Sequence, residues 1–274
     1  MAYTEGKIAV ITGAGSGIGR ALAQQLNAAG CRLHLSDIDA DALAETVVSL
    51  SRKDLRVQTR VVDVAQRADM HAWADEVAAQ DGHVDIVINN AGVALLSLVE
   101  DCDYDNLDWL MGINFWGVVH GTQAFLPLLR KARQGHVINM SSVFGLIGVP
   151  TQSAYNAAKF AVRGYTEAMR QEMAGTNIHV CCVHPGGIRT NIARTARGGD
   201  PTLTPEQRGR NFEKNARTSA DAAAAQIITA IEKRKKRLLI GFDARIISLL
   251  VRLFPVSYTR FLPSLAQAQA AMTE

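Results

Sequence analysis

The sequence predicts an α/β fold in which parallel strands alternate with helices. Short apolar runs rich in β-branched residues, at 7–12, 32–36 and 55–62, alternate with segments of helical periodicity. The first run leads directly into a glycine-rich turn at 13–19, and a helix expected at 20–29 follows that turn. The chain has 274 residues, 48% of them hydrophobic, which is enough for one large domain with a full core.

The glycine-rich turn predicts a site for the phosphates of a nucleotide. Its glycines follow the pattern G-x-x-x-G-x-G, which lets the backbone approach an anion closely. The N–H groups and the dipole of the following helix then favour negative charge. The position of the turn directly after the first strand strengthens this interpretation. We expect a pyrophosphate to bind at five residues of the turn: Gly13, Ser16, Gly17, Ile18 and Gly19.

Asp37 ends the second run and predicts the type of dinucleotide. It lies about 20 residues past the glycines, where a carboxylate accepts hydrogen bonds from both hydroxyls of an adenosine ribose and repels a 2′-phosphate. Ile38 follows it, where an arginine would favour the phosphate, and Ser16 supplies no positive charge. NAD is therefore favoured over NADP. The alternative is that Asp37 only caps the next helix, expected at 40–51.

The ends of two further strands add residues to the same edge of the sheet. Asp63 and Val64 follow the third run, and we assign them to an adenine pocket because open α/β sheets bind ligands at the carboxyl ends of their strands. A helix is expected at 66–80 and a fourth strand at 84–89. That strand runs into a tripeptide that can lie against a ribose or a nicotinamide, or that only forms a turn: Asn90, Ala91 and Gly92.

Tyr155 and Lys159 predict acid–base chemistry. They lie four residues apart in a helix expected at 152–173, so they share one face of that helix. A cation beside a phenol moves its pKa of about 10 toward neutrality, where general acid–base catalysis is most effective. Ser142, at the end of the apolar run 137–140, can hold a carbonyl or alkoxide oxygen against the phenol. An isolated Tyr-x-x-x-Lys is more often an ordinary amphipathic helix, so the interpretation depends on the other motifs.

Asn114 lies within a long helical region expected at 103–132. A buried asparagine is unfavourable inside a helix unless its side chain has hydrogen bonds to make. Two interpretations have equal weight. Asn114 either bends the helix and holds a water on a proton path from Lys159, or makes a core hydrogen bond to a neighbouring strand.

The charge and cysteine content exclude several classes of protein. A net charge of +3, without a basic stripe interleaved with aromatic residues, does not indicate a nucleic-acid-binding protein. The four cysteines do not have the spacing of metal ligands, so we expect reduced thiols and no metal site. The N-terminus lacks a basic segment followed by a long apolar run, which predicts a cytoplasmic protein without a signal peptide.

Taken in order, these motifs resemble those of the short-chain dehydrogenase/reductase family over about residues 5–241. The matching elements are Thr12-Gly13-x-x-x-Gly17-x-Gly19, Asn89-Asn90-Ala91-Gly92, Asn114, Ser142, Tyr155-x-x-x-Lys159 and Pro185-Gly186. The resemblance implies that Tyr155 is the acid/base and that Lys159 binds the ribose hydroxyls and lowers the tyrosine pKa. It also implies that Ser142 positions the substrate oxygen and that Asn114 sustains a proton relay.

The resemblance has further implications for the cofactor, the fold and the assembly. The turn after the sixth strand, with Pro185 and Gly186, would lie beside the cofactor, and Ile188 and Thr190 would hold the carboxamide of the cofactor. The fold would be a Rossmann-like, doubly wound sheet of seven mainly parallel strands in the order 3-2-1-4-5-6-7, with helices on both faces. Homodimers or homotetramers would be usual.

The expected function is that of an NAD-dependent oxidoreductase that interconverts a secondary alcohol and a ketone. The apolar content of 93–101 and 143–151 favours a hydrophobic substrate. One alternative is an NADPH-dependent carbonyl or acyl-thioester reductase, which Asp37 disfavours. Another is a non-enzymatic nucleotide-sensing scaffold, which needs the glycine turn but not Ser142, Tyr155 and Lys159.

The last third of the chain predicts a lid and an extension. We expect one oxidoreductase domain at 1–241, with a substrate lid at 186–217 whose polar part is 194–215. A helix at 219–236 and a last strand at 238–241 complete it, and 242–274 forms a helical extension. The apolar stretch of the extension is too short to span a bilayer. Packing on the domain or on a partner subunit is favoured over peripheral contact with a membrane surface.

Overall fold

The computed structural model describes residues 3–262 of the chain, and its centre is a parallel sheet of seven strands. The strand order is β11-β7-β6-β4-β1-β2-β3, which confirms the predicted order when only the strands of this sheet are counted. Every pairing within it is parallel. The strands are β1 (Ile8–Thr12), β2 (Arg32–Asp37), β3 (Val57–Val61), β4 (Ile86–Asn89), β6 (Gly135–Met140), β7 (Ile178–Pro185) and β11 (Arg237–Ile240).

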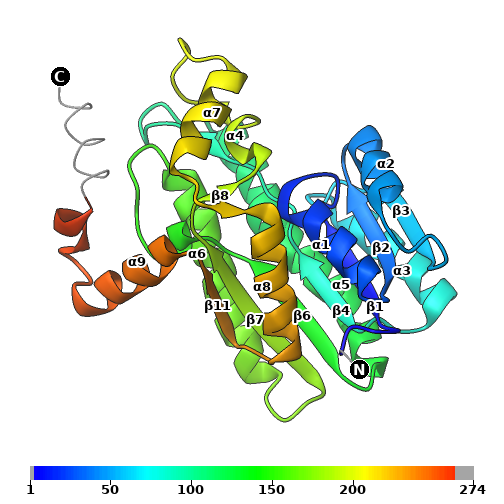
Figure 1. Ribbon diagram of the computed structural model, residues 1–274. Helices are drawn as coiled ribbons and strands as arrows, with labels where there is room; N and C mark the ends of the chain where they lie inside the picture. The colour runs from blue at the N-terminus through cyan, green and yellow to red at the C-terminus, as the bar shows by residue number, and fades with distance from the viewer. Residues whose placement is uncertain (1–2, 263–274) are drawn as a thin grey trace.

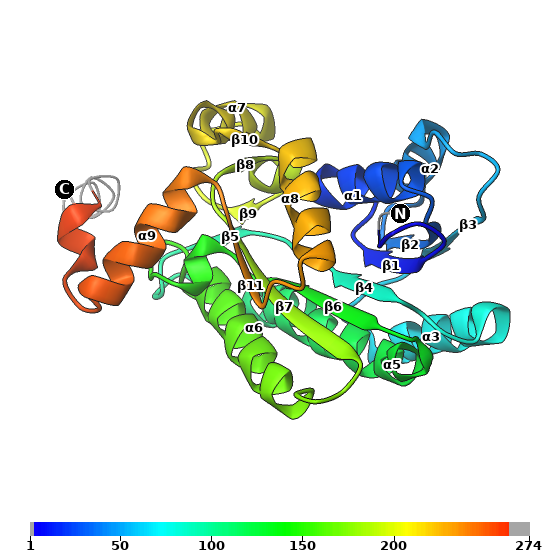
Figure 2. The same ribbon diagram turned by 60° about the horizontal axis from the view of Figure 1, so that its bottom comes forward.

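Helices cover both faces of this sheet (Figures 1 and 2). One hydrophobic core lies between the sheet and α1 and α8, and a second lies between the sheet and α3 and α5. The central strands β1, β4 and β6 are buried along their whole length, because a parallel sheet covered on both faces has no solvated side. The helices are α1 (Gly17–Ala28), α2 (Ala40–Ser49), α3 (Arg67–Asp81), α4 (Tyr104–Met111), α5 (Gly117–Lys131), α6 (Ser153–Glu172), α7 (Pro205–Asn215), α8 (Ala220–Glu232) and α9 (Phe242–Leu253).

Short strands and helical turns lie at the carboxyl edge of the sheet and in the segments that pass over this edge. Two small parallel sheets pair β5 with β9 and β8 with β10. These strands are β5 (Leu95–Leu96), β8 (Ile188–Arg189), β9 (Arg197–Gly198) and β10 (Thr218–Ser219). A π-helix and three 3₁₀ turns complete the described elements: Gly112–Trp116, Val143–Gly145, Asn191–Ala193 and Tyr258–Phe261.

Three expected segments differ from the structure. The helical region predicted at 103–132 is interrupted by the π-helix, which separates α4 from α5. The polar lid segment predicted at 194–215 contains α7, which begins with a capping box between Thr204 and Gln207. The helix predicted at 219–236 ends at Glu232, because Arg234 adopts a left-handed backbone (φ 49°) and turns the chain toward β11.

The extension leaves the domain at Gly241, whose φ of 96° favours glycine, and continues into α9. In Figures 1 and 2, α9 projects from the β11 edge of the sheet. Residues 263–274 of the predicted extension lie outside the described residues. Within residues 3–262, no helix is both long and apolar enough to cross a membrane.

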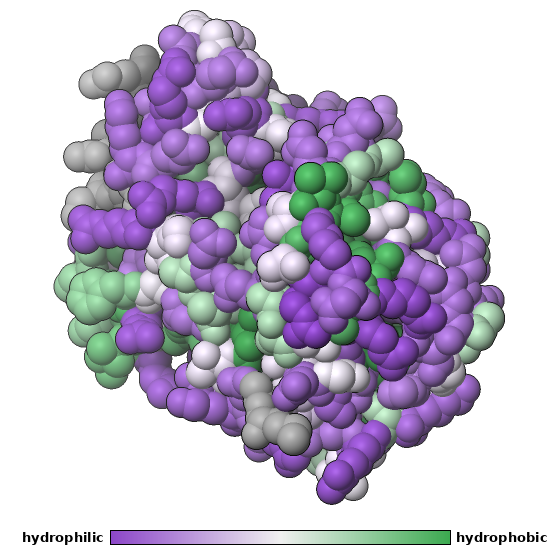
Figure 3. All heavy atoms as spheres, turned by 45° about the vertical axis from the view of Figure 1, so that its right-hand side comes forward, coloured by the Kyte–Doolittle hydropathy of each residue, from purple (hydrophilic) through white to green (hydrophobic). Residues whose placement is uncertain are grey.

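The opposite end of the molecule has an ordinary surface. Figure 3 shows that the face carrying α2 and β3 is mainly hydrophilic, with hydrophobic side chains exposed in patches. Val48 of α2 and Val61 of β3 are among the exposed apolar residues. Single exposed residues of this kind are normal on a soluble domain.

Candidate active site

The residues predicted to be functional follow the carboxyl ends of different strands. The glycine turn follows β1, Asp37 ends β2, Asn90 follows β4 and Ser142 follows β6 closely. Because all seven strands are parallel, these ends meet at one edge of the sheet. Figure 1 shows that α7 and β8 lie above this edge. The fold therefore brings together residues that are far apart in the sequence.

Ser142, Tyr155 and Lys159 converge at this edge. The side chain of Ser142 lies close enough to that of Tyr155 to lower the pKa of the phenol. The Nζ atom of Lys159 lies 5.6 Å from the centre of the Tyr155 ring and donates to the carbonyl oxygen of Met140 at 3.0 Å. The lysine is 4% exposed, so its cation is held inside the protein beside the phenol. The spacing of Tyr155 and Lys159 on α6 thus places both groups in one volume, as predicted.

The pKa of Tyr155 differs from the expectation. Burial raises the pKa of Tyr155 to about 12, and the neighbouring side chain of Ser142 opposes that rise. Burial also lowers the pKa of Lys159 to about 8. Tyr155 packs against an apolar cluster that includes Leu95 and Leu110, and the ammonium of Lys159 faces the tyrosine ring. Desolvation therefore outweighs the expected effect of the lysine on the phenol.

Asn114 is fully buried inside the π-helix. Its Oδ1 atom accepts a hydrogen bond from the backbone N–H of Val93, and its Nδ2 atom donates to the carbonyl oxygen of the same residue, both at 2.8 Å. The helix thus deviates at Asn114, and the side chain bonds to the segment after β4; the proton path from Lys159 stays a prediction. A Cβ atom on Gly92 would lie 3.1 Å from Oδ1 of Asn114 and 3.5 Å from Nζ of Lys159, so all three residues adjoin.

The glycine turn is fixed by contacts with the segment after β4. Nδ2 of Asn90 donates to the carbonyl oxygens of Thr12 and Gly13, at 2.9 and 3.0 Å. A Cβ atom on Gly13 would lie 2.7 Å from Cα of Ala91, and the φ of Gly13 is 65°. Glycine is therefore required here for close approach. The side chain of Asn90 holds the turn rather than facing outward, while Ala91 packs against it.

The amino end of α1 fits the pyrophosphate of a dinucleotide. Ser16 is the N-cap residue, yet its side chain makes no capping hydrogen bond, which leaves the first N–H groups of the helix for another acceptor. Gly17 has a φ of 52°, and a Cβ atom there would lie 3.2 Å from the side chain of Thr190. Ile18 and Gly19 follow in the first turn of α1. The structure therefore brings Thr190, from beyond β7, to the glycine turn.

The carboxylate of Asp37 lies against the glycine turn. Its Oδ2 atom accepts from the backbone N–H of Gly15 at 2.8 Å, and its Oδ1 atom accepts from that of Asp39 at 3.1 Å. The N-cap of α2 is Asp39, whose side chain accepts from the N–H of Ala42. The alternative in which Asp37 caps the next helix is therefore wrong. Asp37 is partly exposed beside the turn, where a ribose adjoining the pyrophosphate would lie.

The remaining predicted cofactor residues lie at the same edge. Asp63 accepts a hydrogen bond from the N–H of Ala65, and the side chain of Val64 is buried against Gly117 of α5. Val64 can therefore meet a ligand through its backbone rather than its side chain. On the other side of the edge, β7 ends in a turn whose residues include Pro185, Gly186 and Ile188.

Three residues that organise the pocket escaped the sequence analysis. Asn156 of α6 donates to the carbonyl oxygens of Phe144 and Ile147 and so holds the loop after Ser142. Asp243 of α9 accepts from the N–H of Gly187 at 2.7 Å, and the hydroxyl of Tyr258 accepts from that of Gly148 at 2.9 Å. Their hydrogen-bond partners are distant in the sequence, and no local sequence pattern predicts such contacts.

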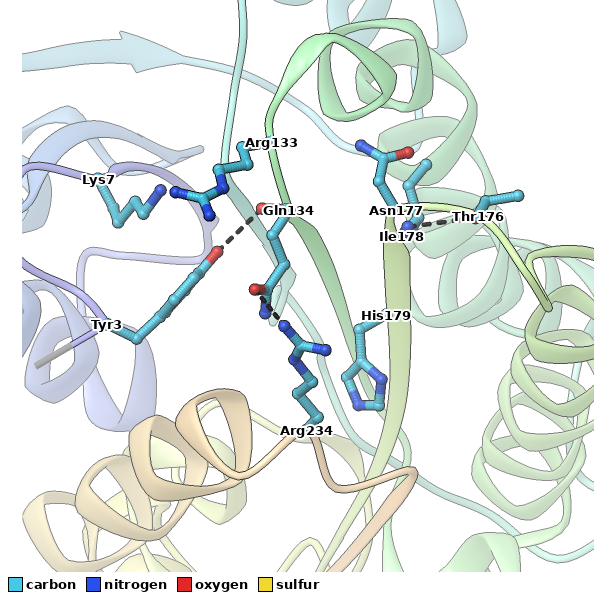
Figure 4. Close-up of a pocket in the computed structure, with 9 residues that line it drawn as sticks. All are labelled: Tyr3, Lys7, Arg133, Gln134, Thr176, Asn177, Ile178, His179 and Arg234. Carbon is cyan, nitrogen blue, oxygen red and sulfur yellow. Dashed lines mark hydrogen bonds between the residues drawn. The ribbon is translucent and has the colours of Figure 1, made fainter.

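A separate pocket of about 540 Å³ lies at the opposite edge of the sheet. Its lining residues precede β1, β6, β7 and β11, so they gather at the amino ends of the parallel strands. Figure 4 shows hydrogen bonds from the Tyr3 hydroxyl to the backbone of Gln134 and from Arg234 to the Gln134 side chain. None of the predicted site residues lines this pocket. The pocket is therefore distinct from the candidate active site.

Comparisons with known proteins agree with the fold. The family model described as short chain dehydrogenase matches residues 7–200. SadH of Mycobacterium tuberculosis, classed by its name among the oxidoreductases, is 46% identical over 265 residues, which are 95% of each chain. A 3-ketodihydrosphingosine reductase of Bacteroides thetaiotaomicron is 37% identical over 190 residues, 68% of this chain and 65% of that protein.

A solved structure gives the same result in three dimensions. It is a short-chain dehydrogenase/reductase from Burkholderia phymatum in complex with NAD. The two chains are 30% identical with a TM-score of 0.83, over 92% of this chain and 95% of the other. The match of the family model, residues 7–200, extends from the strand before the glycine turn to beyond the helix that carries Tyr155 and Lys159. The chain belongs to the short-chain dehydrogenase/reductase family of oxidoreductases.

Proposed function

We propose that this protein is an NAD(H)-dependent oxidoreductase that interconverts a hydrophobic secondary alcohol and its ketone. The observation that carries the proposal is the group formed by Tyr155, the neighbouring side chain of Ser142 and the buried cation of Lys159. A scaffold that only binds a nucleotide has no need of a buried, desolvated lysine, because burying an ammonium is costly. The proposed preference for NAD rests on Asp37 beside the glycine turn.

Each of these side chains has one task in the proposed reaction. In the direction of reduction, Ser142 donates a hydrogen bond to the carbonyl oxygen, and Tyr155 gives its proton to the alkoxide that forms. In oxidation, the tyrosine takes the hydroxyl proton. Lys159 places a positive charge beside the phenol and stabilises its ionised form. When bound, the nicotinamide supplies or accepts the hydride at its C4 atom, so the alcohol loses two electrons and two hydrogens in total.

The residues around the tyrosine favour an apolar substrate. Tyr155 packs with Leu95 and Leu110, and the loop after Ser142 contributes Val143 and Leu146. Apolar surroundings strengthen the interactions of Ser142 and Tyr155 with a developing charge. The name of the Bacteroides relative describes a reductase of a long-chain keto lipid, which supports a substrate of that class.

The test is steady-state kinetics of NAD reduction with a panel of secondary alcohols of increasing chain length. We expect Tyr155→Phe to lower kcat by about 10²- to 10⁴-fold, because the variant lacks the proton donor and acceptor. Tyr104→Phe is the matched control, since Tyr104 is exposed on α4 and should leave kcat unchanged. Full activity of the Tyr155→Phe enzyme would refute the mechanism.

A further inference from the structure

The outward face of α9 carries a stripe of exposed apolar side chains. Its members recur at intervals of four, three and four residues, which places them on one side of a helix. Their exposed fractions are 74%, 41%, 57% and 60%, far above those of the core. We call this the α9 stripe: Phe242, Ile246, Leu249 and Leu253. Phe254, Val256 and Phe261 continue the exposed apolar surface beyond the helix.

The other side of α9 is already packed on the domain. Ala244 is fully buried, and Ser248 accepts a hydrogen bond from Arg237 of β11. Asp243 accepts from the N–H of Gly187. The position of α9 is therefore fixed by its inner side, and within residues 3–262 the stripe adds nothing to that packing. Figures 1 and 2 both show α9 standing away from the body of the domain.

The charges around the α9 stripe are of one sign. Arg245 and Arg252 are exposed and lie about two turns apart on the same flank of the stripe, and Arg260 is exposed beyond the helix. The single acidic residue between positions 242 and 262 is Asp243, which is engaged with Gly187. Apolar side chains flanked by arginines suit the interface of a bilayer that contains anionic lipids.

A second copy of the chain fits this surface poorly. In a two-fold symmetric contact, the same patch meets itself, so the stripe of one copy would lie against the stripe of the other. Arg245 and Arg252 would then approach their own counterparts, with no acidic residue of α9 free to pair with them. Like charges brought together at an interface oppose association. The charge pattern therefore favours a lipid surface over a dimer contact.

The segment that carries the stripe also contacts two segments of the candidate active site. Asp243 accepts a hydrogen bond from the N–H of Gly187, and the hydroxyl of Tyr258 accepts one from the N–H of Gly148. Gly148 belongs to the loop after Ser142, and Gly187 belongs to the turn after β7. A bilayer in contact with α9 would thus lie near both segments.

We infer that the α9 stripe docks this enzyme on an anionic membrane, and that its substrates are lipid alcohols or ketones that partition into that membrane. The substrate class rests on the proposed function, but the docking does not. Apolar side chains enter the boundary of the acyl chains while the arginines meet the lipid phosphates. Substrate then passes from the lipid to Tyr155 without crossing water.

The docking is tested by sedimentation of the full chain with vesicles of phosphatidylglycerol and phosphatidylcholine. We expect binding that weakens with salt and with vesicles of phosphatidylcholine alone. The Leu249→Ser/Leu253→Ser variant should bind about tenfold or more weakly, because two exposed apolar side chains are lost. Arg245→Ala/Arg252→Ala should lose about fivefold for each arginine. Val48→Ser/Val61→Ser, on the α2 and β3 face, is the matched control and should bind as the wild type does.

The inference is overturned if the wild-type chain stays in the supernatant. It is also overturned if the wild type and Leu249→Ser/Leu253→Ser bind the vesicles equally. If light scattering shows that Leu249→Ser/Leu253→Ser halves the mass while vesicles are not bound, the stripe contacts a second copy. If only a chain ending at Leu262 sediments, the residues after it cover the stripe. Turnover of a water-soluble secondary alcohol, measured in parallel, should be unchanged in the stripe variant. If the wild-type chain does not turn over such an alcohol, the proposed function is refuted, while the docking result stands.

Discussion

At the scale of the residue, burial sets the behaviour of the reacting groups. The pKa of Tyr155 rises to about 12 and that of Lys159 falls to about 8, so both shifts favour the neutral forms. At neutral pH the phenol therefore keeps its proton, while most of the lysine stays charged. A protonated phenol is the form that the proposed reduction of a ketone requires. In oxidation the proton must first leave, so that direction should accelerate with rising pH.

The buried lysine predicts a pH-dependent stability. The pKa of Lys159 is about 8 in the folded chain against 10.5 ordinarily, so the unfolded chain binds more protons between these values. The free energy of unfolding therefore gains a contribution from Lys159 as pH rises from about 8 to 10.5. In Lys159→Met we expect this rise to be absent, and the variant to be about 1–3 kcal/mol more stable at pH 7. Urea denaturation across this pH range measures both effects.

The control for this prediction is Lys131→Met, because Lys131 is exposed at the end of α5. That variant should keep the wild-type rise in stability. The lost hydrogen bond between Lys159 and the carbonyl of Met140 reduces the gain of Lys159→Met, and Tyr155 acts in the opposite sense above pH 10. An unaltered pH dependence in Lys159→Met would show that the lysine is not desolvated.

Asp37 and Asp39 allow a matched test of cofactor choice. Asp37→Ala removes the carboxylate beside Gly15, so we expect KM for NAD to rise about tenfold and the use of NADP to improve, because repulsion of the 2′-phosphate is lost. Asp39→Ala removes the cap of α2 and should lower stability by about 1 kcal/mol without changing the preference. Kinetics with both cofactors give the result. An unchanged NAD/NADP ratio in Asp37→Ala would remove the ribose role.

At the scale of the element, the side chain of Arg197 joins the predicted lid segment to α4. The guanidinium of Arg197 lies 3.7 Å from the centre of the Trp109 ring and donates to Asn106 at 3.2 Å. The backbone of the same residue pairs with β5, since its N–H donates to the carbonyl of Ala94. These contacts join β9 to α4 beside the apolar cluster around Tyr155. The predicted lid segment is thus held against the side of the domain that carries Trp109 and the apolar cluster.

Loss of the Arg197 contacts should affect substrate binding more than the chemical step. For Arg197→Ala we expect KM for the alcohol to rise about 2- to 5-fold with a smaller change in kcat, because Arg197 is exposed and a cation–π contact at an exposed site contributes about 0.5–1 kcal/mol. Limited proteolysis should cut the lid faster in this variant. Arg210→Ala, an exposed residue of α7, is the control and should change neither quantity. A fall in kcat alone would assign Arg197 another role.

Elements with local signals were predictable, whereas contacts between distant segments were not. The strand, glycine turn and helix at the start of the chain have signals that depend only on neighbouring residues, and the structure reproduces them. The spacing of Tyr155 and Lys159 on α6 was predictable for the same reason. The π-helix was not, because the partner of Asn114 is Val93, far away in the sequence. The capping box of α7 was visible at 204–207, but the absence of an apolar face obscured that helix.

The direction of the Tyr155 pKa shift shows the same limit. The sequence placed a lysine beside the phenol, and this proximity is found. It could not show that Leu95 and Leu110, from other segments, enclose the ring and desolvate its hydroxyl. Burial depends on the complete packing, so a local motif predicts which groups meet better than it predicts their charge.

At the scale of the whole molecule, the two edges of the sheet carry different groups of residues. Every predicted catalytic residue lies at or near the carboxyl edge, while the pocket lined by Lys7, Arg133 and Arg234 lies at the amino edge. Parallel strand direction alone separates them, since each strand contributes one end to each edge. The extension adds a third region beside β11, and there the proposed membrane contact lies. Reaction, lid and docking surface thus occupy neighbouring parts of one half of the molecule.

The contacts of Asp243 and Tyr258 have a consequence for how such enzymes diversify. These two side chains accept hydrogen bonds from the backbones of Gly187 and Gly148, which lie in the turn after β7 and in the loop after Ser142. We expect changes in the final segment to shift both of these segments while the predicted proton-transfer groups stay in place. A lineage with this core could therefore acquire new substrate preferences by remodelling its tail, without a single replacement at the reacting centre.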